Sequence, residues 1–193
     1  MNLRRIFAVK TLHARLQPHP LYRPLKVTLR SSHGLYESLE DMRLPFNPGY
    51  TLDRLKPIPD EDLRRAAKLV LAGDDHAKAM RGIMVWLRLE MQVGWMIEFE
   101  TYRHGVECLS TSSSMHTELK NLKGADLAEA KQAGLSNRVY RRGVMLSYQA
   151  LRHIYMARQH HRHPDWQIFC QMIEKLPFFE YLIYPEKQAN LQP

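Results

Sequence analysis

The stretch IMVWLRLEMQVGWMIEFETY, residues 83–102, changes its hydrophobic period in the middle. Apolar residues fill every second position from Ile83 to Met91, which favours a half-buried β-strand. From Val93 the apolar residues recur at helical spacing, and Gly105 is the expected end of that helix. A strand at 83–91 followed directly by a helix predicts an α+β fold. A continuous helix over 76–104 is the alternative interpretation.

Prolines and glycines divide the rest of the chain. Alternation predicts a second strand at 25–30, and spacing predicts a short helix from Leu35 to Met42 that ends before Pro45. A proline-rich loop follows over 45–59, and Asp60 is the expected N-cap of the next helix. The buried stripe of that helix should comprise Leu63, Ala66, Ala67, Val70 and Leu71, with Gly73 after its end.

The second half of the chain is expected to be helical after a polar loop. Consecutive hydroxyl residues favour a loop over 108–116, before a polar helix over 116–132. Ser136 is the expected cap of a long helix that carries Val139, Tyr140, Val144, Leu151, Ile154, Tyr155 and Arg158 on its buried face. Asp165 should cap the last strong helix. We expect a mostly helical single α+β domain with a small sheet. Residues 1–60 would form a basic extended arm and proline-rich loop, and 61–193 the helical core.

Positive charge is concentrated in two blocks of the chain. The net charge is +8, from 28 Lys and Arg against 20 Asp and Glu. Residues 1–30 hold seven basic residues and residues 138–164 hold six, and neither block contains an acid. Such blocks suggest anionic partners, either nucleotide phosphates or nucleic acid. A solvated surface is the alternative, and for the first block it is the favoured one.

The sequence also argues against several classes of protein. No apolar run is long enough for a membrane helix, and Met1–Thr11 does not resemble a secretory signal. The two cysteines are expected to be reduced thiols of a cytoplasmic protein. Four histidines at 153–163 lie in a basic environment, where a metal ion is disfavoured, so we expect no metal.

A candidate anion site combines Arg103-His104 with the serine loop that follows. Serine hydroxyls and free backbone amides bind phosphate, and an arginine adds a bidentate fork. The residues expected in this pocket are Arg103, Ser110, Ser112 and Ser113. A self-capping, solvated loop is the alternative. Further arginines at 138, 142, 152 and 158 could face one anionic ligand from a single helix.

These residues resemble a motif of the flavin-dependent thymidylate synthases. The motif of that family is Arg-His-Arg, followed by seven further residues and a Ser, and then by one more residue and an Arg. Here Arg103-His104-Gly105 is likewise followed by seven residues and then Ser113. Downstream, Ser147 to Arg158 and His161 to Ile168 resemble the family's second conserved block with one residue inserted. The resemblance covers roughly residues 80–180.

Several ligand positions of the family are changed in this chain. Its second motif arginine falls on Gly105, its acid on Thr111 and its later arginine on Met115. In the downstream block, other ligand positions fall on Ser147, Gln149 and His153. Arg103, His104, Ser113 and Arg158 are retained.

The resemblance implies a function, a cofactor and an assembly. The family transfers a one-carbon unit from methylenetetrahydrofolate to dUMP with FAD and NADPH, in a homotetramer with shared active sites. It implies Arg103 and His104 as FAD-binding residues, and Ser112, Ser113, Arg152 and Arg158 as nucleotide-binding residues, with Ser113 the candidate catalytic residue. One alternative is a non-catalytic module that binds a nucleotide, or nucleic acid through residues 1–30 and 138–164. Another is a structural protein that uses its arginines against an acidic partner.

Overall fold

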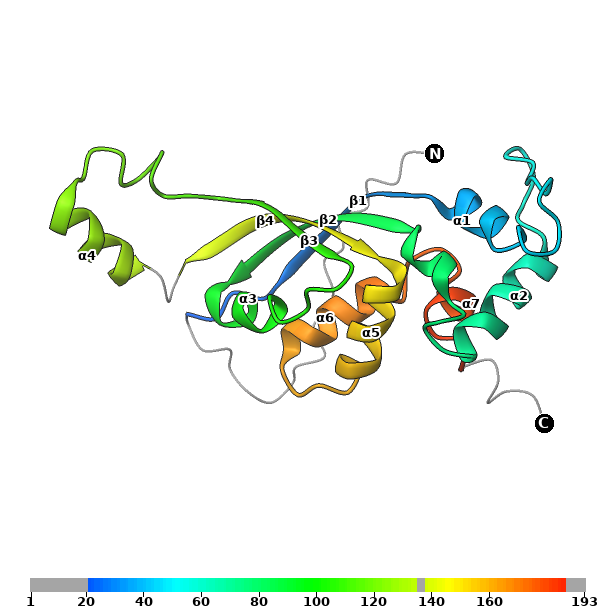
Figure 1. The fold of residues 1–193 in the computed structure, drawn as a ribbon. Helices are drawn as coiled ribbons and strands as arrows, with labels where there is room; N and C mark the ends of the chain where they lie inside the picture. Colours follow the sequence, from blue (N-terminus) through cyan, green and yellow to red (C-terminus); the bar gives the residue numbers. More distant parts are fainter. Residues whose placement is uncertain (1–20, 135–137, 187–193) are drawn as a thin grey trace.

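A computed structural model describes residues 21–134 and 138–186. Its centre is a four-stranded antiparallel sheet in the order β1-β2-β4-β3 (Figure 1). The strands are β1 (Lys26–His33), β2 (Met84–Gln92), β3 (Val106–Thr111) and β4 (Val139–Ser147). The predicted strands at 83–91 and 25–30 are therefore confirmed, and a continuous helix over 76–104 is excluded.

The alternation in β2 buries one side of the strand. Val85, Leu87, Leu89 and Met91 are at most 2% exposed, whereas the residues between them reach the surface. Leu87 lies opposite Val144 of β4, and α5 (Tyr148–Arg158) and α6 (Pro164–Ile173) cover this face of the sheet (Figure 1). One layer of helices on one face of a small sheet is the expected α+β architecture.

The remaining helices of the described residues surround this core. They are α1 (Leu35–Asp41), α2 (Asp60–Leu71), the 3₁₀ turn η1 (Lys78–Arg81), α3 (Val93–Phe99), α4 (Gly124–Gly134) and α7 (Phe179–Leu182). The stripe of α2 is buried as predicted except for Leu71, which is 47% exposed. Pro59, not Asp60, holds the N-cap position of α2. In the first turn the Asp60 carboxylate can still favour the helix through the helix dipole.

Three predictions in the second half of the chain are wrong. Residues 139–147 form the strand β4 instead of the first part of a long helix, because they pair with β2 on one side and β3 on the other. Residues 106–111 form the edge strand β3, so the predicted loop begins only after Thr111. α4 begins at Gly124, later than expected, and the predicted cap Ser136 lies outside the described residues.

Two helix ends also differ from expectation. α3 ends at Phe99 rather than at Gly105. His163, not Asp165, caps α6, because its ring nitrogen accepts a hydrogen bond from the Asp165 backbone. The Asp165 carboxylate instead accepts from the Tyr22 hydroxyl at 2.6 Å and the Leu25 amide at 2.9 Å. It thereby fixes the chain that leads into β1.

Residues 1–20 of the predicted basic arm lie outside the described residues. Within the described part of the predicted 1–60 segment, Leu25 and Val27 are buried and β1 pairs with β2. None of the helices in the described ranges has the length and apolar character needed to cross a membrane.

Candidate functional site

Arg103 and His104 lie in the turn that joins α3 to β3. Both side chains are exposed, and within the described residues neither makes a hydrogen bond or an ion pair. Gly105 follows with φ +68°, and its carbonyl accepts a hydrogen bond from the Ser147 amide at 2.9 Å. The turn thus presents two adjacent basic donors to the surface.

The geometry of Gly105 explains one departure from the family motif. A Cβ atom at this position would lie 2.5 Å from the Ser147 hydroxyl oxygen, and the positive φ disfavours any L side chain. The arginine that the family carries here would therefore strain the turn.

Arg158, at the end of α5, is held beside this turn by an aromatic pair. Its Nε donates to the Tyr102 hydroxyl at 2.7 Å, and its guanidinium carbon lies 4.7 Å from the Trp166 ring centroid. Glu98 of α3 lies 4.0 Å from the guanidinium and accepts the indole N–H of Trp166 at 2.8 Å. This indole hydrogen bond is the main reason that the pKa of Glu98 is lowered. Arg158 is therefore part of a packed cluster, and its partner Tyr102 directly precedes Arg103 in the sequence.

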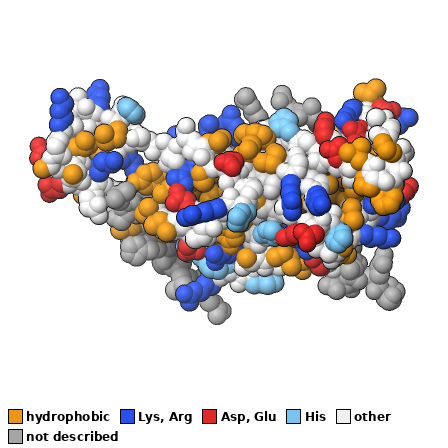
Figure 2. All heavy atoms as spheres, viewed as in Figure 1, with side chains coloured by type: hydrophobic (Ala, Val, Ile, Leu, Met, Phe, Trp, Pro, Cys, Tyr) orange, Lys and Arg blue, Asp and Glu red, His pale blue; other side chains and the backbone are white. Residues whose placement is uncertain are grey.

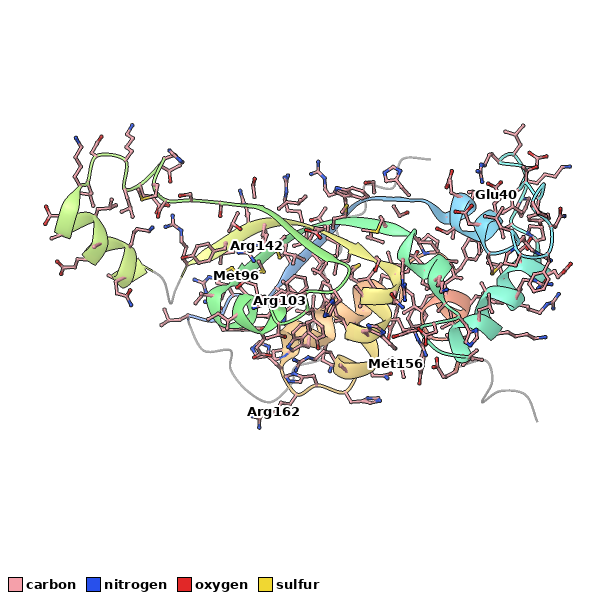
Figure 3. The ribbon with its side chains drawn as sticks, in the orientation of Figure 1. Glu40, Met96, Arg103, Arg142, Met156 and Arg162 are labelled. Atoms are coloured by element: carbon pink, nitrogen blue, oxygen red, sulfur yellow. The ribbon has the colours of Figure 1, made fainter. Side chains whose placement is uncertain are left out.

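Arg142 of β4 points toward α3 and is also engaged. Its Nε donates to the Thr111 hydroxyl at 2.7 Å, and a terminal nitrogen pairs with the Glu100 carboxylate. The same nitrogen lies 3.8 Å from the Cys108 sulfur. Figure 3 labels Arg142 and Arg103 near the same end of the sheet. Thr111, at the position of the family's acid, thus acts as a hydrogen-bond acceptor for this arginine.

The serines continue the edge of the sheet. The Ser112 amide donates to the Arg141 carbonyl at 2.7 Å, and the Ser112 hydroxyl accepts the Arg141 amide at 2.9 Å. The Ser113 hydroxyl accepts the Met115 amide at 3.1 Å. Ser110 is exposed on β3. Both Ser112 and Ser113 are exposed and retain a hydroxyl proton to donate. No contact joins Ser113 to Arg103 or Arg158 among the described residues.

Arg152 lies away from the other candidates, toward the C-terminal end of the described chain. One terminal nitrogen donates to the Ile183 carbonyl at 2.6 Å and to a Glu186 oxygen at 3.0 Å. The second terminal nitrogen pairs with the other oxygen of Glu186. Since both terminal nitrogens are engaged, this arginine has little donor capacity left for a ligand.

The arginines of block 138–164 do not form one anionic-ligand face. Part of the block is β4 and part is α5, and five of its six arginines contact acidic side chains from other segments. The positive charge of this acid-free segment is therefore largely balanced by acids that come from other parts of the chain. Figure 2 shows Lys and Arg side chains interspersed with Asp and Glu on the face in view.

One histidine of this block also lies beside an acid from another segment. His153 lies 2.8 Å from Asp74 through its Nε2 nitrogen. Within the described ranges, no group of three or more His, Cys, Asp or Glu side chains could hold a metal ion.

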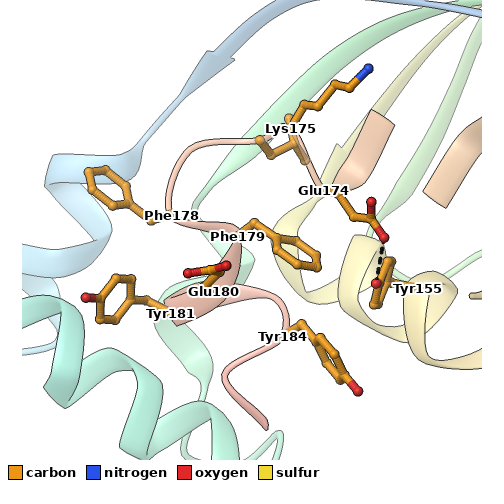
Figure 4. Close-up of a pocket in the computed structure, with 9 residues that line it drawn as sticks. Tyr155, Glu174, Lys175, Phe178, Phe179, Glu180, Tyr181 and Tyr184 are labelled. Atoms are coloured by element: carbon orange, nitrogen blue, oxygen red, sulfur yellow. Dashed lines mark hydrogen bonds between the residues drawn. The ribbon is translucent and has the colours of Figure 1, made fainter. Parts of the chain in front are cut away.

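A hollow in the described surface lies elsewhere, between α5, the end of α6 and α7. It has a volume of about 730 Å³ and is lined by aromatic residues that include Tyr155, Phe179 and Tyr184 (Figure 4). The Tyr155 hydroxyl donates to Glu174 at 2.9 Å, and burial followed by this bond raises the pKa of Tyr155. None of the motif residues lines this hollow, so it is separate from the candidate site.

Sequence reasoning missed the supporting residues of the Arg158 cluster. The sequence did not indicate that Tyr102, Trp166 and Glu98 surround Arg158. The available signal was helical spacing, which places Trp95, Phe99 and Tyr102 on one side of the chain. It could not show that α6 brings Trp166 to the same place.

No protein-family model and no curated protein matches this sequence. The structure, however, is similar to two solved structures of thymidylate synthase X (ThyX) from Helicobacter pylori, each with FAD and dUMP. The first has a TM-score of 0.63 and 13% identity, and the match covers 83% of this chain and 98% of that chain. The second has the same TM-score and identity, with coverage of 82% and 98%. The fold is that of the flavin-dependent thymidylate synthases, which confirms the expected resemblance at the level of fold.

Proposed function

We propose that this chain is a cytoplasmic protein of nucleotide biosynthesis that binds FAD and a pyrimidine nucleotide and transfers a one-carbon unit to dUMP or a related nucleotide. One observation carries the proposal. Arg103 and His104 are exposed and unpartnered within the described residues, on a fold similar to one solved with FAD and dUMP. Unpaired basic donors in a fixed turn are suited to a phosphate or diphosphate group.

The donor set at this turn fits the diphosphate of FAD. Arg103 offers a guanidinium fork and His104 a ring nitrogen, with no acid competing for either in the described residues. Gly105 cannot supply the family's second arginine. When bound, FAD would relay a hydride from NADPH to the one-carbon unit. The chain's own contribution is to hold the anionic groups and orient the nucleotide.

The candidate nucleotide-binding residues differ in how many hydrogen-bond donors they still have available for a ligand. Ser112 and Ser113 can each donate a hydroxyl proton to phosphate, and we assign Ser113 as the candidate catalytic residue. Arg158 uses its Nε for Tyr102 and keeps terminal nitrogens for a ligand. Arg152 is the weakest candidate because Glu186 and the Ile183 carbonyl already engage it.

We further propose a homotetramer with sites at subunit junctions. Ser113 does not contact Arg103 or Arg158 within the described chain, so a second copy would have to bring such groups together. Light scattering at micromolar concentration should give the mass of a tetramer. A monomer under these conditions would refute a shared site.

The decisive experiment is an absorption spectrum of the purified protein followed by calorimetry with dUMP. Bound FAD gives a visible absorption band, and dUMP should bind. Replacing Arg103 with Ala should weaken dUMP or FAD binding by about 1.5–3 kcal/mol, the usual net contribution of a charged hydrogen bond. Arg162→Ala is the matched control, since Arg162 is exposed and has no contact in the described residues. Equal effects of the two substitutions on binding would refute the assignment of the ligand site to the turn that holds Arg103.

A non-catalytic nucleotide- or nucleic-acid-binding protein is the second candidate. The net charge of +8 and the acid-free residues 1–30 favour it. It predicts no flavin band and binding of a short DNA single strand that weakens steeply with salt. Because most arginines of block 138–164 pair with acids, the basic sequence of residues 1–30 is the main candidate segment for binding nucleic acid.

A further inference from the structure

The two faces of the sheet differ in what covers them. α5 and α6 lie on one face, and the residues of β2 that point there are buried (Figure 1). The side chains between them point to the other face, and none of these is buried. Residues that are paired in register share a face, so the uncovered face continues across β1 and β4. Within the described residues this side of the sheet is therefore an open surface.

Trp86 lies in the middle of this uncovered face. Its strand, β2, is flanked by β1 on one side and by β4 on the other. The His33 ring of β1 packs against the indole at an angle of 85°, with 5.6 Å between the ring centroids. Trp86 is partly exposed, whereas Trp95 and Trp166 are only 2% and 0% exposed. The face thus presents a large aromatic ring, which is a platform on which an unpaired base can stack.

Basic side chains lie beside this aromatic pair. Arg88 is the next residue of β2 on the same face, Lys26 lies one outward position further along on β1, and Arg30 lies at the bulge of β1. All three are exposed, and their side chains make no hydrogen bond or ion pair within the described residues. Gly143 lies opposite Arg88 on β4 and has no side chain that could cover the guanidinium. These cations are therefore available to a ligand.

The acids of this face do not neutralise those cations. Glu90 lies across from Lys26, but its ion pair is with Arg141 of β4, at 3.4 Å. Glu107 is on β3, at the opposite edge of the sheet from β1. Positive charge therefore predominates on the half of the face that β1 and β2 form, where the indole also lies. The chain carries +8 overall, and residues 1–30, which end within β1, hold seven Lys and Arg and no acid.

An aromatic ring beside unpaired cations on an open sheet suits a single-stranded nucleic acid. Such a strand offers unpaired bases that stack on aromatic rings, and phosphates that attract Lys and Arg. A duplex keeps its bases paired and stacked, so it would use the charges and not the indole. A second copy of this positively charged chain would bring like charges together. The combination of charge and exposed ring therefore favours the single strand.

We propose that the uncovered face of the sheet binds single-stranded nucleic acid, with Trp86 stacked on a base and with Arg88, Lys26 and Arg30 on phosphates. This inference goes beyond the proposed one-carbon transfer and requires neither FAD nor dUMP. It assigns a surface to the second candidate function. That surface is distinct from the surroundings of Arg158, because α5 lies on the other side of the sheet (Figure 1).

The first test measures binding of a short strand to the full chain by fluorescence anisotropy. The probe is a fluorescein-labelled strand of about eight nucleotides, within the usual site size, prepared once as DNA and once as RNA. Binding of either strand supports the inference, and the tighter of the two identifies the preferred sugar. Binding of neither strand overturns it. A duplex of the same length that competes as well as the single strand would show that only charge is recognised, which also overturns it.

Two substitutions test the residues named. Trp86→Ala should weaken strand binding roughly 5- to 100-fold, the range expected for loss of one base–aromatic stack. Phe46→Ala is the matched control and should have no effect, since Phe46 is 79% exposed but lies in the loop before α2. Arg88→Ala should reduce the slope of log K against log salt by about 0.7, as expected for one lost phosphate contact, whereas Arg162→Ala should leave it unchanged. If neither Trp86→Ala nor Arg88→Ala changes binding, the strand binds elsewhere on the chain and the inference is refuted.

Tryptophan emission gives a readout that a merely structural role would not change. Since Trp95 and Trp166 are buried, quenching by an unlabelled strand should come from Trp86. Trp86→Phe keeps an aromatic ring, so it should retain strand binding while the quenching is lost. Quenching that persists in this variant contradicts the inference. Circular dichroism verifies the fold of each variant, and if Trp86→Ala does not fold, Trp86→Phe and Arg88→Ala still provide the test.

Further outcomes separate this inference from the proposed function. An excess of dUMP should not displace the strand, and displacement would mean that both occupy one site, which refutes a separate face. A change of mass in Trp86→Ala without loss of strand binding would show that a second copy covers the face, which refutes it too. Binding of FAD and dUMP but of no strand supports the proposed function and overturns this inference. Binding of the strand but of neither FAD nor dUMP does the reverse.

Discussion

Replacing Arg158 with Ala should measurably destabilise the fold, because this arginine is held by its neighbours. The lost hydrogen bond to Tyr102 contributes about 1 kcal/mol, an ordinary net value. The cation–π contact with Trp166, at 4.7 Å, contributes about 1 kcal/mol more. The Glu98 carboxylate, 4.0 Å away and 42% exposed, adds little because water screens it.

The expected loss in the free energy of unfolding is about 2 kcal/mol, which corresponds to a fall in Tm of roughly 4–8 °C for a chain of this size. Urea unfolding followed by tryptophan fluorescence, with calorimetry for Tm, measures the effect. Arg162→Ala is the control and should change stability by less than about 0.5 kcal/mol. If Arg158→Ala is as stable as this control, the contacts described for Arg158 do not stabilise the fold and the reasoning is refuted.

Three further predictions follow from burial, backbone geometry and charge. Iodoacetamide at pH 8 should modify the exposed Cys108 and spare Cys170, whose pKa is raised to about 12 mainly by burial; equal rates would contradict this. Gly34→Ala should cost more than about 2 kcal/mol in urea unfolding, because φ is +81° and the new Cβ would lie 2.2 Å from a backbone oxygen. Gly73→Ala, with φ +108° and open space, should cost less, and a reversed order would refute the reasoning. The lowered pKa of Glu98 means that its contribution to stability is present above its ordinary value of 4.5 and is lost as pH falls through the folded value. Glu98→Gln should therefore flatten the loss of stability below about pH 4.5, as acid titration of the unfolding midpoint would show.

Local patterns in the sequence were sufficient for the elements whose buried and exposed positions alternate with a regular period within one segment. The switch of period at Val93 correctly predicts β2 and the start of α3. The buried stripe of α2 is also correct for four of its five residues. In these segments the periodicity that buries apolar side chains is visible in the sequence itself.

The candidate site depended on contacts that no local pattern records. The motif spacing predicts Arg103, His104 and Ser113 as site residues. The glycine at 105 is required by the close approach of Ser147. The sequence could not show that Arg158 is held by Tyr102, because the two residues come from different elements.

Only the tertiary structure decided the state of residues 139–147 and the partners of the arginines around them. In isolation this segment is compatible with a helix, but as a strand it pairs on both sides, with β2 and with β3. Arg142 meets Glu100, and Arg152 meets Glu186. A sequence with no acid nearby thus still pairs its arginines, because electrostatic attraction depends on distance in space and not on separation along the chain.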